Sequence, residues 1–429
     1  MTRAPHPAFS GWRICGAAVL TQAVAIGFTL GSVGVFAAPL AQELGATATQ
    51  FNVGVSVFSL VMNLSMPLIG RQLDRGRIRG VMTAGACLLA CSLAAMSQAR
   101  ELWQVGVCFG VGSAIGMAML GPMSSSTAMA NWFDRLRGRA LGIANMGGPA
   151  GPIVIAPAAA FAIGEFGWRP TLLVFAALTL AVGVPCVRFG ILDRPSDVGQ
   201  HPDGDAPAPD AVAAVSPDPQ PAMTAAAIPA FAWSAGTLAR CRDFWFLAIA
   251  AAPFGAVGIV MAANAIPYMT WLGVSPEAAA FVVVPQSIGA VTGPLLFGSL
   301  ADRIHPRLLF IGLIGVLCAA LVGLVSRPAY GLALALFGVV GVVGGSMMAV
   351  YGALIGRLFG VLAFGQVMGM GALVGVPVVF AAPLVFGSAF DRTGSYASGL
   401  LILTAALATA ALLFALLPSG PARRPATPN

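Results

Sequence analysis

The chain has 429 residues, of which 58% are hydrophobic and only 9% charged, and its mean hydropathy is +0.89. A soluble domain carries about 25% charged residues, so this composition excludes a water-exposed globular surface and indicates a membrane protein. All 22 basic residues are arginines, and against 15 acidic residues they give a formal net charge of +7.

Twelve stretches of at least 18 residues contain no Arg, Asp or Glu. They are residues 14–42, 44–70, 80–99, 102–133, 140–164, 170–187, 244–276, 278–301, 308–326, 328–356, 358–390 and 393–422. Each is long enough for a helix that crosses a hydrocarbon core of about 30 Å. None shows the polar–apolar alternation of a membrane β-strand, and the first is too long for the apolar core of a signal peptide. We therefore predict an all-α membrane protein with twelve transmembrane helices.

The arginines lie mostly on one side of the predicted membrane. Eighteen fall in the tails and in the loops that share a side with the two termini, and four fall in the loops on the other side: Arg100, Arg169, Arg327 and Arg392. Basic residues are enriched in cytoplasmic loops, so we expect both termini to be cytoplasmic and the protein to lie in the cytoplasmic (inner) membrane. The basic charge then reflects topology, and no nucleic-acid partner is expected.

One long polar stretch, rich in proline and alanine, divides the twelve runs into six and six. Such a composition cannot bury enough apolar surface to offset the entropy of ordering, which predicts a flexible cytoplasmic linker. The predicted organisation is a tail (1–13), a six-helix half (14–192), the linker (193–242), a second six-helix half (243–417) and a tail (418–429).

The two halves repeat each other at an offset of 228 residues. This offset aligns Pro39 with Pro267, the pair Asp74–Arg75 with Asp302–Arg303, Pro149 with Pro377, and Trp168 with Tyr396. Two parallel six-helix halves are typical of carriers whose binding site lies between the halves and is exposed to each side in turn. We expect the halves to be related by a pseudo-two-fold axis along the membrane normal.

Two loop segments carry a family resemblance. The segment Gly70-Arg-Gln-Leu-Asp-Arg-Gly-Arg-Ile-Arg79 and its counterpart at 298–307 resemble the cytoplasmic loop motif of the major facilitator superfamily. Three further segments, around Gly11–Arg13, Asn131–Ala144 and Leu238–Trp245, are similar to the branch of monocarboxylate transporters and oxalate:formate antiporters. The resemblance covers essentially the whole chain and implies the major facilitator fold.

The resemblance also implies a conformational latch between the halves at the cytoplasmic side. Its candidate members are Asp74, Arg75, Arg135, Arg139, Asp302, Arg303 and Arg357. The alternative is that these charges only solvate the helix ends and fix the topology, since exposed ion pairs contribute about 0–1 kcal/mol each. Pro149 and Pro377 lack a backbone N–H, so we expect helix kinks there that act as hinges or packing points.

Ionisable residues are absent from the middle of the predicted spans. Every Asp, Glu, Arg and His lies at or beyond a span end, so we expect no enzyme activity, no cofactor and no metal. The seven cysteines are scattered, and no histidine or acid accompanies Cys87 and Cys91 in their run. Because the chain has no lysine, it has no ATP-binding loop and cannot be an ATP-driven pump by itself.

Span 8 departs from the carriers that the chain resembles. In these carriers span 8 carries an Arg and often an Asp one turn earlier, whereas the corresponding positions here are Gly293 and Gly289. Recognition is left to neutral groups, each of which either bonds to a neighbouring helix or faces a cavity. The candidates are Gln22, Thr29, Asn145, Asn264, Tyr268, Gln286, Tyr351 and Gln366.

These features predict a secondary active or facilitative transporter of a small organic acid that works by alternating access. The alternative is an exporter of an apolar or neutral compound. With no acid in the middle of a span, any proton dependence is expected to lie in the substrate's own protonation, or the protein works as an exchanger. The expected partners are a small-molecule substrate and the lipid bilayer; no obligatory protein partner is expected, and we predict a monomer.

Overall fold

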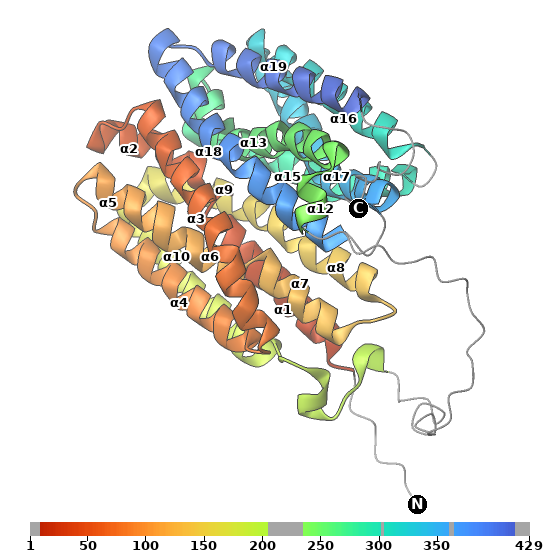
Figure 1. The fold of residues 1–429 in the computed structure, drawn as a ribbon. Helices are drawn as coiled ribbons and strands as arrows, with labels where there is room; N and C mark the ends of the chain where they lie inside the picture. The colour runs from red at the N-terminus through yellow and green to blue at the C-terminus, as the bar shows by residue number, and fades with distance from the viewer. Residues whose placement is uncertain (1–8, 205–234, 302–303, 360–363, 417–429) are drawn as a thin grey trace, which may run out of the picture.

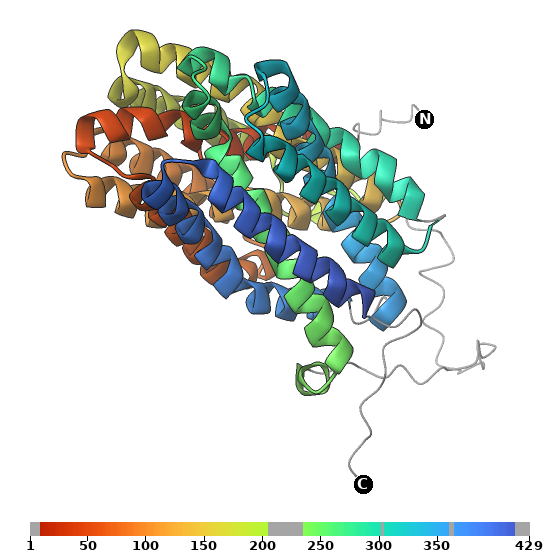
Figure 2. The same ribbon diagram turned by 90° about the horizontal axis from the view of Figure 1, so that it is seen from above.

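The computed structural model describes residues 9–204, 235–301, 304–359 and 364–416. These residues form helices and turns with no β-strand, which confirms the predicted all-helical fold. Figures 1 and 2 show two groups of helices side by side, one formed by the N-terminal half of the chain and one by the C-terminal half.

The helices of the N-terminal half are interrupted in several places. Three short segments of its later spans, η2, η3 and η4, are π-helical. The elements of this half are α1 (Gly11–Gly27), η1 (Val33–Phe36), α2 (Ala37–Leu44), α3 (Ala48–Asp74), α4 (Ile78–Ser97), α5 (Leu102–Val107), η2 (Cys108–Ser113), α6 (Ala114–Leu120), α7 (Pro122–Trp132), α8 (Arg137–Asn145), α9 (Gly147–Phe166), α10 (Trp168–Leu178), η3 (Thr179–Gly183) and η4 (Cys186–Gly190).

The C-terminal half contains longer uninterrupted helices. Its elements are α12 (Ala235–Ala239), α13 (Arg242–Trp271), α14 (Pro276–Ala280), α15 (Val283–Ala301), α16 (Pro306–Val325), α17 (Tyr330–Phe359), α18 (Phe364–Thr393) and α19 (Tyr396–Ala415). The helix α18 continues through Pro377 and Pro383.

Within the described residues, eleven helices are long and apolar enough to cross a membrane. The sequence predicted twelve, and the difference is the first run, which breaks between Phe28 and Ser32. At the break the Gly31 N–H donates to the Ile26 carbonyl at 2.8 Å. A Cβ on Gly31 would lie 2.4 Å from the ring of Pro152. The helix α9 therefore packs directly against the backbone of the break, in space that a larger side chain at position 31 would need. The first span is therefore α1, η1 and α2 in sequence.

Glycines let helices within each half approach at backbone distance. A Cβ on Gly147 or Gly151 would lie 2.2 Å from a carbonyl oxygen of α1. In the other half, a Cβ on Gly341 would lie 1.9 Å from the Gln286 carbonyl oxygen of α15. Small residues at helix contacts are how membrane helices associate without a hydrophobic driving force.

The two halves meet at the end of the bundle that carries α2 and α5, which we call the distal end (Figure 1). The opposite end, where α7 joins α8, is called the terminal end. At the distal end α3 packs against α18, and α14 packs against α9. The Asp391 carboxylate on α18 accepts hydrogen bonds from the backbone N–H groups of Ala48, at 3.0 Å, and Thr49, at 2.8 Å. It thereby caps the first turn of α3 in the other half.

The start of the predicted linker is ordered against the N-terminal half, which corrects the expectation of a flexible segment for residues 193–204. We call residues 191–204 the strap. Asp193 accepts a hydrogen bond from the Arg79 N–H at the start of α4, at 2.8 Å, and the Leu192 carbonyl accepts one from the Trp132 indole at 3.0 Å. Residues 205–234 of the predicted linker lie outside the described part of the chain.

Asp203 fixes the far end of the strap. Its carboxylate accepts hydrogen bonds from the backbone N–H groups of Asp134, Arg135 and Leu136, at 2.6 to 3.3 Å, just before α8. Desolvation raises the pKa of Asp203, but these three N–H groups and the charge of Arg135 lower it more, so its net pKa lies below the ordinary value. A depressed pKa means that the contact stabilises the fold at neutral pH and is lost as the pH falls through that pKa.

We predict that Asp203→Asn releases the strap. The variant should show several-fold faster hydrogen–deuterium exchange of the amides at 134–136, and the wild type should approach the same rate only below about pH 4, after correction for the intrinsic rate. Asp197→Asn is the matched control, because Asp197 accepts only from the Arg194 N–H within the strap. Equal protection in Asp203→Asn and wild type would contradict this role.

Candidate functional site

Two of the predicted recognition residues meet within the N-terminal half. The Gln22 amide on α1 donates to the Asn145 side-chain oxygen at the end of α8, at 3.3 Å. Gln22 is buried, with 1% of its surface exposed. The pair lies beside the junction of α8 and α9, where Pro149 occupies the first turn of α9. Pro149 thus follows the turn at Met146 that interrupts the span Gly138–Phe166, and its role as a kink remains a prediction.

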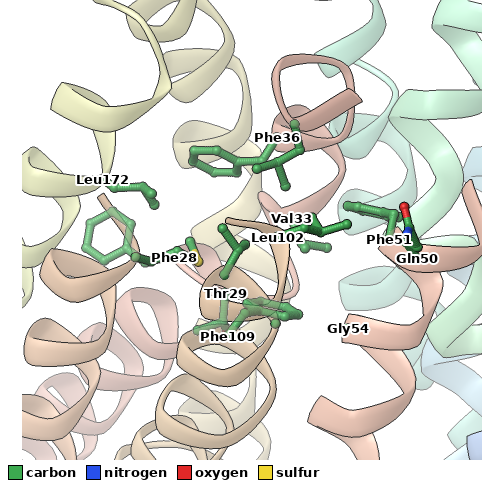
Figure 3. A pocket seen from close by; sticks show the side chains of 14 residues that line it. Phe28, Thr29, Val33, Phe36, Gln50, Phe51, Gly54, Leu102, Phe109 and Leu172 are labelled. Carbon is green, nitrogen blue, oxygen red and sulfur yellow. The ribbon is translucent and has the colours of Figure 1, made fainter. Parts of the chain in front are cut away.

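Thr29 lies in the break of the first span and lines a small apolar cavity of about 60 Å³. Its hydroxyl donates to the Ala25 carbonyl at 2.5 Å and lies 3.3 Å from the Met117 sulfur. Figure 3 shows Phe28, Phe36 and Phe109 around the same cavity. The lining is almost entirely apolar, so this space suits an apolar group rather than a charged one.

The predicted residues of the C-terminal half are not gathered at one place. Tyr268 is buried and its hydroxyl donates to the Leu324 carbonyl at 2.6 Å, a bond within its own half. Gln286 and Tyr351 are half-buried on α15 and α17, and Gln366 is exposed at the start of α18. Asn264 pairs across the halves, as described below.

The glycines at the expected charged positions of span 8 are fixed by packing. A Cβ on Gly289 would lie 2.4 Å from the Gly338 carbonyl oxygen, and one on Gly293 would lie 2.2 Å from the Val342 carbonyl oxygen. Both contacts are with the backbone of α17, so neither position has room for an Arg or Asp. The missing charges are therefore a consequence of how α15 packs on α17.

A cavity of about 500 Å³ lies between the halves at the distal end, and we call it the vestibule. It is lined by η1, α2 and the start of α3 on one side and by α13, α18 and α19 on the other. Aromatic side chains form much of its wall: Phe51, Trp271, Phe390 and Tyr396. Of the described residues that line it, Asp391 alone carries a charge.

Asn52 on α3 and Asn264 on α13 close the inner side of the vestibule. Each amide donates to the other's oxygen, at 3.2 Å from Asn52 and 2.9 Å from Asn264. Both side chains are buried, with 0% and 2% of their surface exposed. This reciprocal pair and the Asp391 contacts give four hydrogen bonds between the halves at the distal end.

Comparison with known proteins identifies the family. Residues 19–263 match the family model described as Major Facilitator Superfamily. The chain belongs to the Major Facilitator Superfamily. It is thus a multi-pass membrane transporter of a small molecule and not an enzyme.

Relatives of this superfamily member include monocarboxylate transporters. Monocarboxylate transporter 11 of Mus musculus is 29% identical over 419 residues, which cover 95% of this chain and 87% of the relative. Monocarboxylate transporter 1 of Homo sapiens is 30% identical over 196 residues, 45% of this chain and 37% of the relative. The uncharacterized MFS-type transporter YcxA of Bacillus subtilis is 26% identical over 160 residues, 37% of this chain and 39% of the relative.

Solved structures show the same fold. Two inward-facing structures of a bacterial homologue of the human lysosomal transporter Spinster, one unoccupied and one occupied, have TM-scores of 0.72 and 0.69. They are 16% and 15% identical to this chain and cover 96% and 97% of it, each over 97% of its own length.

The candidate latch residues of this Major Facilitator Superfamily transporter can be placed only in part among the described residues. Asp74 is the last residue of α3, and Arg75 and Arg357 are exposed. The guanidinium of Arg139 lies 5.8 Å from the Trp12 ring, and the Arg135 N–H donates to Asp203. Asp302 and Arg303 lie outside the described residues. The latch remains a prediction.

The sequence placed Asn52 in a wider set of polar residues within the spans and Asp391 among the acids at span ends, but neither was among the eight candidate recognition residues. The available signal for Asn52 was a polar amide inside an apolar run, and for Asp391 it was an acid at the end of one. Neither signal names a partner, because the contacts join residues more than 200 positions apart.

We predict that Gly293→Ala destabilises the protein, because its methyl group would meet the backbone of α17. Overpacking of this kind costs about 1–3 kcal/mol, which should lower the midpoint of thermal unfolding in detergent by several degrees. Gly344→Ala on α17 is the matched control, since nothing lies within 4 Å of its Cβ position. Equal midpoints for the two variants would overturn this account of the α15–α17 contact.

A second prediction concerns closure of the distal end. A Cβ on Gly387 would lie 2.7 Å from the Ala48 carbonyl oxygen of the other half, so Gly387→Val should hold the halves apart there. Maleimide labelling of Thr270→Cys in the vestibule, in a variant without other cysteines, should become several-fold faster. Gly369→Val, with open space around its Cβ position, should leave the labelling rate unchanged; an equal rate in both variants would contradict the closure.

Proposed function

We propose that this transporter moves a small monocarboxylic acid across the cytoplasmic membrane by alternating access. The observation that carries the proposal is the match to a monocarboxylate transporter over 95% of the chain. The aromatic and aliphatic lining of the vestibule favours an acid with an apolar body, such as an aromatic carboxylic acid. The structure offers such a substrate neutral hydrogen-bonding groups and no cation among the described residues that line the vestibule.

The arginine distribution supports cytoplasmic termini, which places the distal end outside the cell. The contacts of Asp391 and of the Asn52–Asn264 pair then close the outer side of the protein in this state. In the alternate state these contacts separate, and the latch of Asp74, Arg75, Arg135, Arg139, Asp302, Arg303 and Arg357 joins the halves at the cytoplasmic side. We propose that the monomer is sufficient for this cycle.

Proton coupling is proposed to reside in the substrate. The acids of the described spans lie at the ends of helices, and the one that lines the vestibule, Asp391 at the end of α18, is engaged in capping α3. A dedicated coupling acid would have to face the binding site and change its protonation as the protein changes state. A substrate that crosses as the undissociated acid carries its own proton and needs no such residue.

Export of an apolar compound is the second candidate. It is favoured by the apolar cavity around Thr29 and by the packing of Gly289 and Gly293, which excludes the usual span 8 charges. Burying an anion in a site without a counter-ion is costly, whereas an apolar substrate has no charge to desolvate.

We predict that purified protein in liposomes catalyses counterflow of labelled monocarboxylates, and that exchange persists when the pH gradient is collapsed. Liposomes without protein are the control. Efflux of an apolar dye together with no counterflow across a broad panel of acids would instead establish the exporter. Net uptake that requires the gradient and is abolished by Glu277→Gln in folded protein would contradict substrate-borne coupling.

A further inference from the structure

The Asn52–Asn264 pair has all of its amide hydrogens engaged. Besides the reciprocal bonds, Asn52 donates to the Ala48 carbonyl at 2.9 Å, and Asn264 donates to the Val260 carbonyl at 3.0 Å. Each amide thus gives one N–H to its own helix and one to its partner, and it accepts one N–H in return. The two side chains meet edge to edge, with a donor and an acceptor on each edge.

Opening of the distal end must break this pair. Each amide would then lose one donor contact and one acceptor contact in a low-dielectric region, where an unsatisfied polar group costs about 1–3 kcal/mol. A ligand that presents one donor and one acceptor at the same spacing can replace the lost partner. An undissociated carboxyl group has this edge, as has a primary carboxamide, whereas a carboxylate has two acceptors and no donor.

The surroundings of the pair favour the neutral form of such a ligand. The pair lies at the inner side of the vestibule, whose aromatic wall can hold an apolar body. Asp391, which lines the same cavity, places a negative charge there. The Arg327 guanidinium is stacked 4.3 Å from the Trp271 ring centroid, and Glu277 lies on α14, near Gly164 of α9. An anion at the pair would meet no cation within the described lining of the vestibule.

We propose that Asn52 and Asn264 are the docking point for the undissociated carboxyl group of the substrate. When the distal end opens and the pair separates, the carboxyl group takes the place of one amide and forms its two hydrogen bonds with the other. The inference rests on the proposed function and adds to it the protonation state of the substrate and the residues that read it. The pair is then both a closure of the vestibule and a specificity element.

Competition in the wild-type protein tests the proposal. Counterflow of labelled benzoate in proteoliposomes is measured against unlabelled benzamide and methyl benzoate. Benzamide should half-inhibit within about threefold of the concentration of undissociated benzoic acid, and methyl benzoate, which has no donor, should be at least about tenfold weaker. The apparent affinity for total benzoate should fall about tenfold per pH unit above the acid's own pKa, while that for benzamide stays constant. Equal competition by the ester, or a pH-independent affinity for benzoate, overturns the proposal.

Variants locate the effect. The double variant of Asn52→Ala and Asn264→Ala should weaken benzamide and benzoate competition at least about tenfold. A single variant that keeps the docking amide should compete at least as well as the wild type, because that amide no longer has to leave its partner. Asn63→Ala is the matched control, since its amide donates to the Ser59 carbonyl within α3 at 2.7 Å. Size-exclusion profiles verify folding. Unchanged affinity in the double variant overturns the docking role. Absence of benzoate counterflow in the wild type, with active dye efflux, overturns the proposed function itself and is thereby distinguished.

Discussion

The fold is constrained by the absence of charge from the interior of its membrane spans. Ion pairs cannot join the helices there, so association relies on backbone contact and on neutral hydrogen bonds. The glycines of α9, α15 and α17 bring carbonyl oxygens to distances that no side chain could tolerate. At the distal end the described polar contacts between the halves are made by a neutral amide pair and by one carboxylate that caps a helix.

The two halves use the same repeat differently. The first span of the N-terminal half breaks at Phe28–Ser32, whereas its counterpart α13 is a single helix of 30 residues. At this break Pro152 of α9 packs directly against Gly31. The break turns the hydroxyl of Thr29 toward Ala25 and Met117 and leaves an apolar cavity beside it. Pseudo-symmetry of sequence therefore does not require symmetry of the site.

The sequence predicted the fold well because hydrophobic length is a property of each segment alone. Eleven of the twelve expected helices are long enough in the described chain, and the twelfth run is present in pieces. The composition of the linker was likewise visible, but the docking of Asp203 on the N–H groups before α8 was not, since those groups come together only in the folded chain. A local sequence pattern predicts a helix, but it does not predict which residue from a distant part of the chain caps that helix.

The candidate site was predicted less well for the same reason. Gln22 and Asn145 were both expected to bond to a neighbouring helix or to face a cavity. The sequence could not show that they bond to each other, because this bond depends on the packing of α1 against α8 and α9. Asn264 was expected to bond to a neighbouring helix or to face a cavity, and in the structure it does both, with Asn52 of the other half as its partner. In the sequence, Gly289 and Gly293 were notable because they replace the charged residues of related carriers. In the structure they form the surface of α15 on which α17 packs.

The strength of the distal contacts suits a protein that must separate them repeatedly. A buried ion pair costs about 3–5 kcal/mol when one partner is removed, whereas a neutral hydrogen bond contributes about 0.5–1.5 kcal/mol net. Of the four hydrogen bonds at the distal end, two are neutral and two go to the Asp391 carboxylate at an exposed place, so together they amount to a few kcal/mol. A ligand must supply about 5.5 kcal/mol of differential affinity to move a two-state equilibrium from 1:99 to 99:1. Contacts of this size keep the two states within reach of a small substrate. Buried ion pairs at the same place would leave uncompensated charges whenever the halves separated without resolvating them.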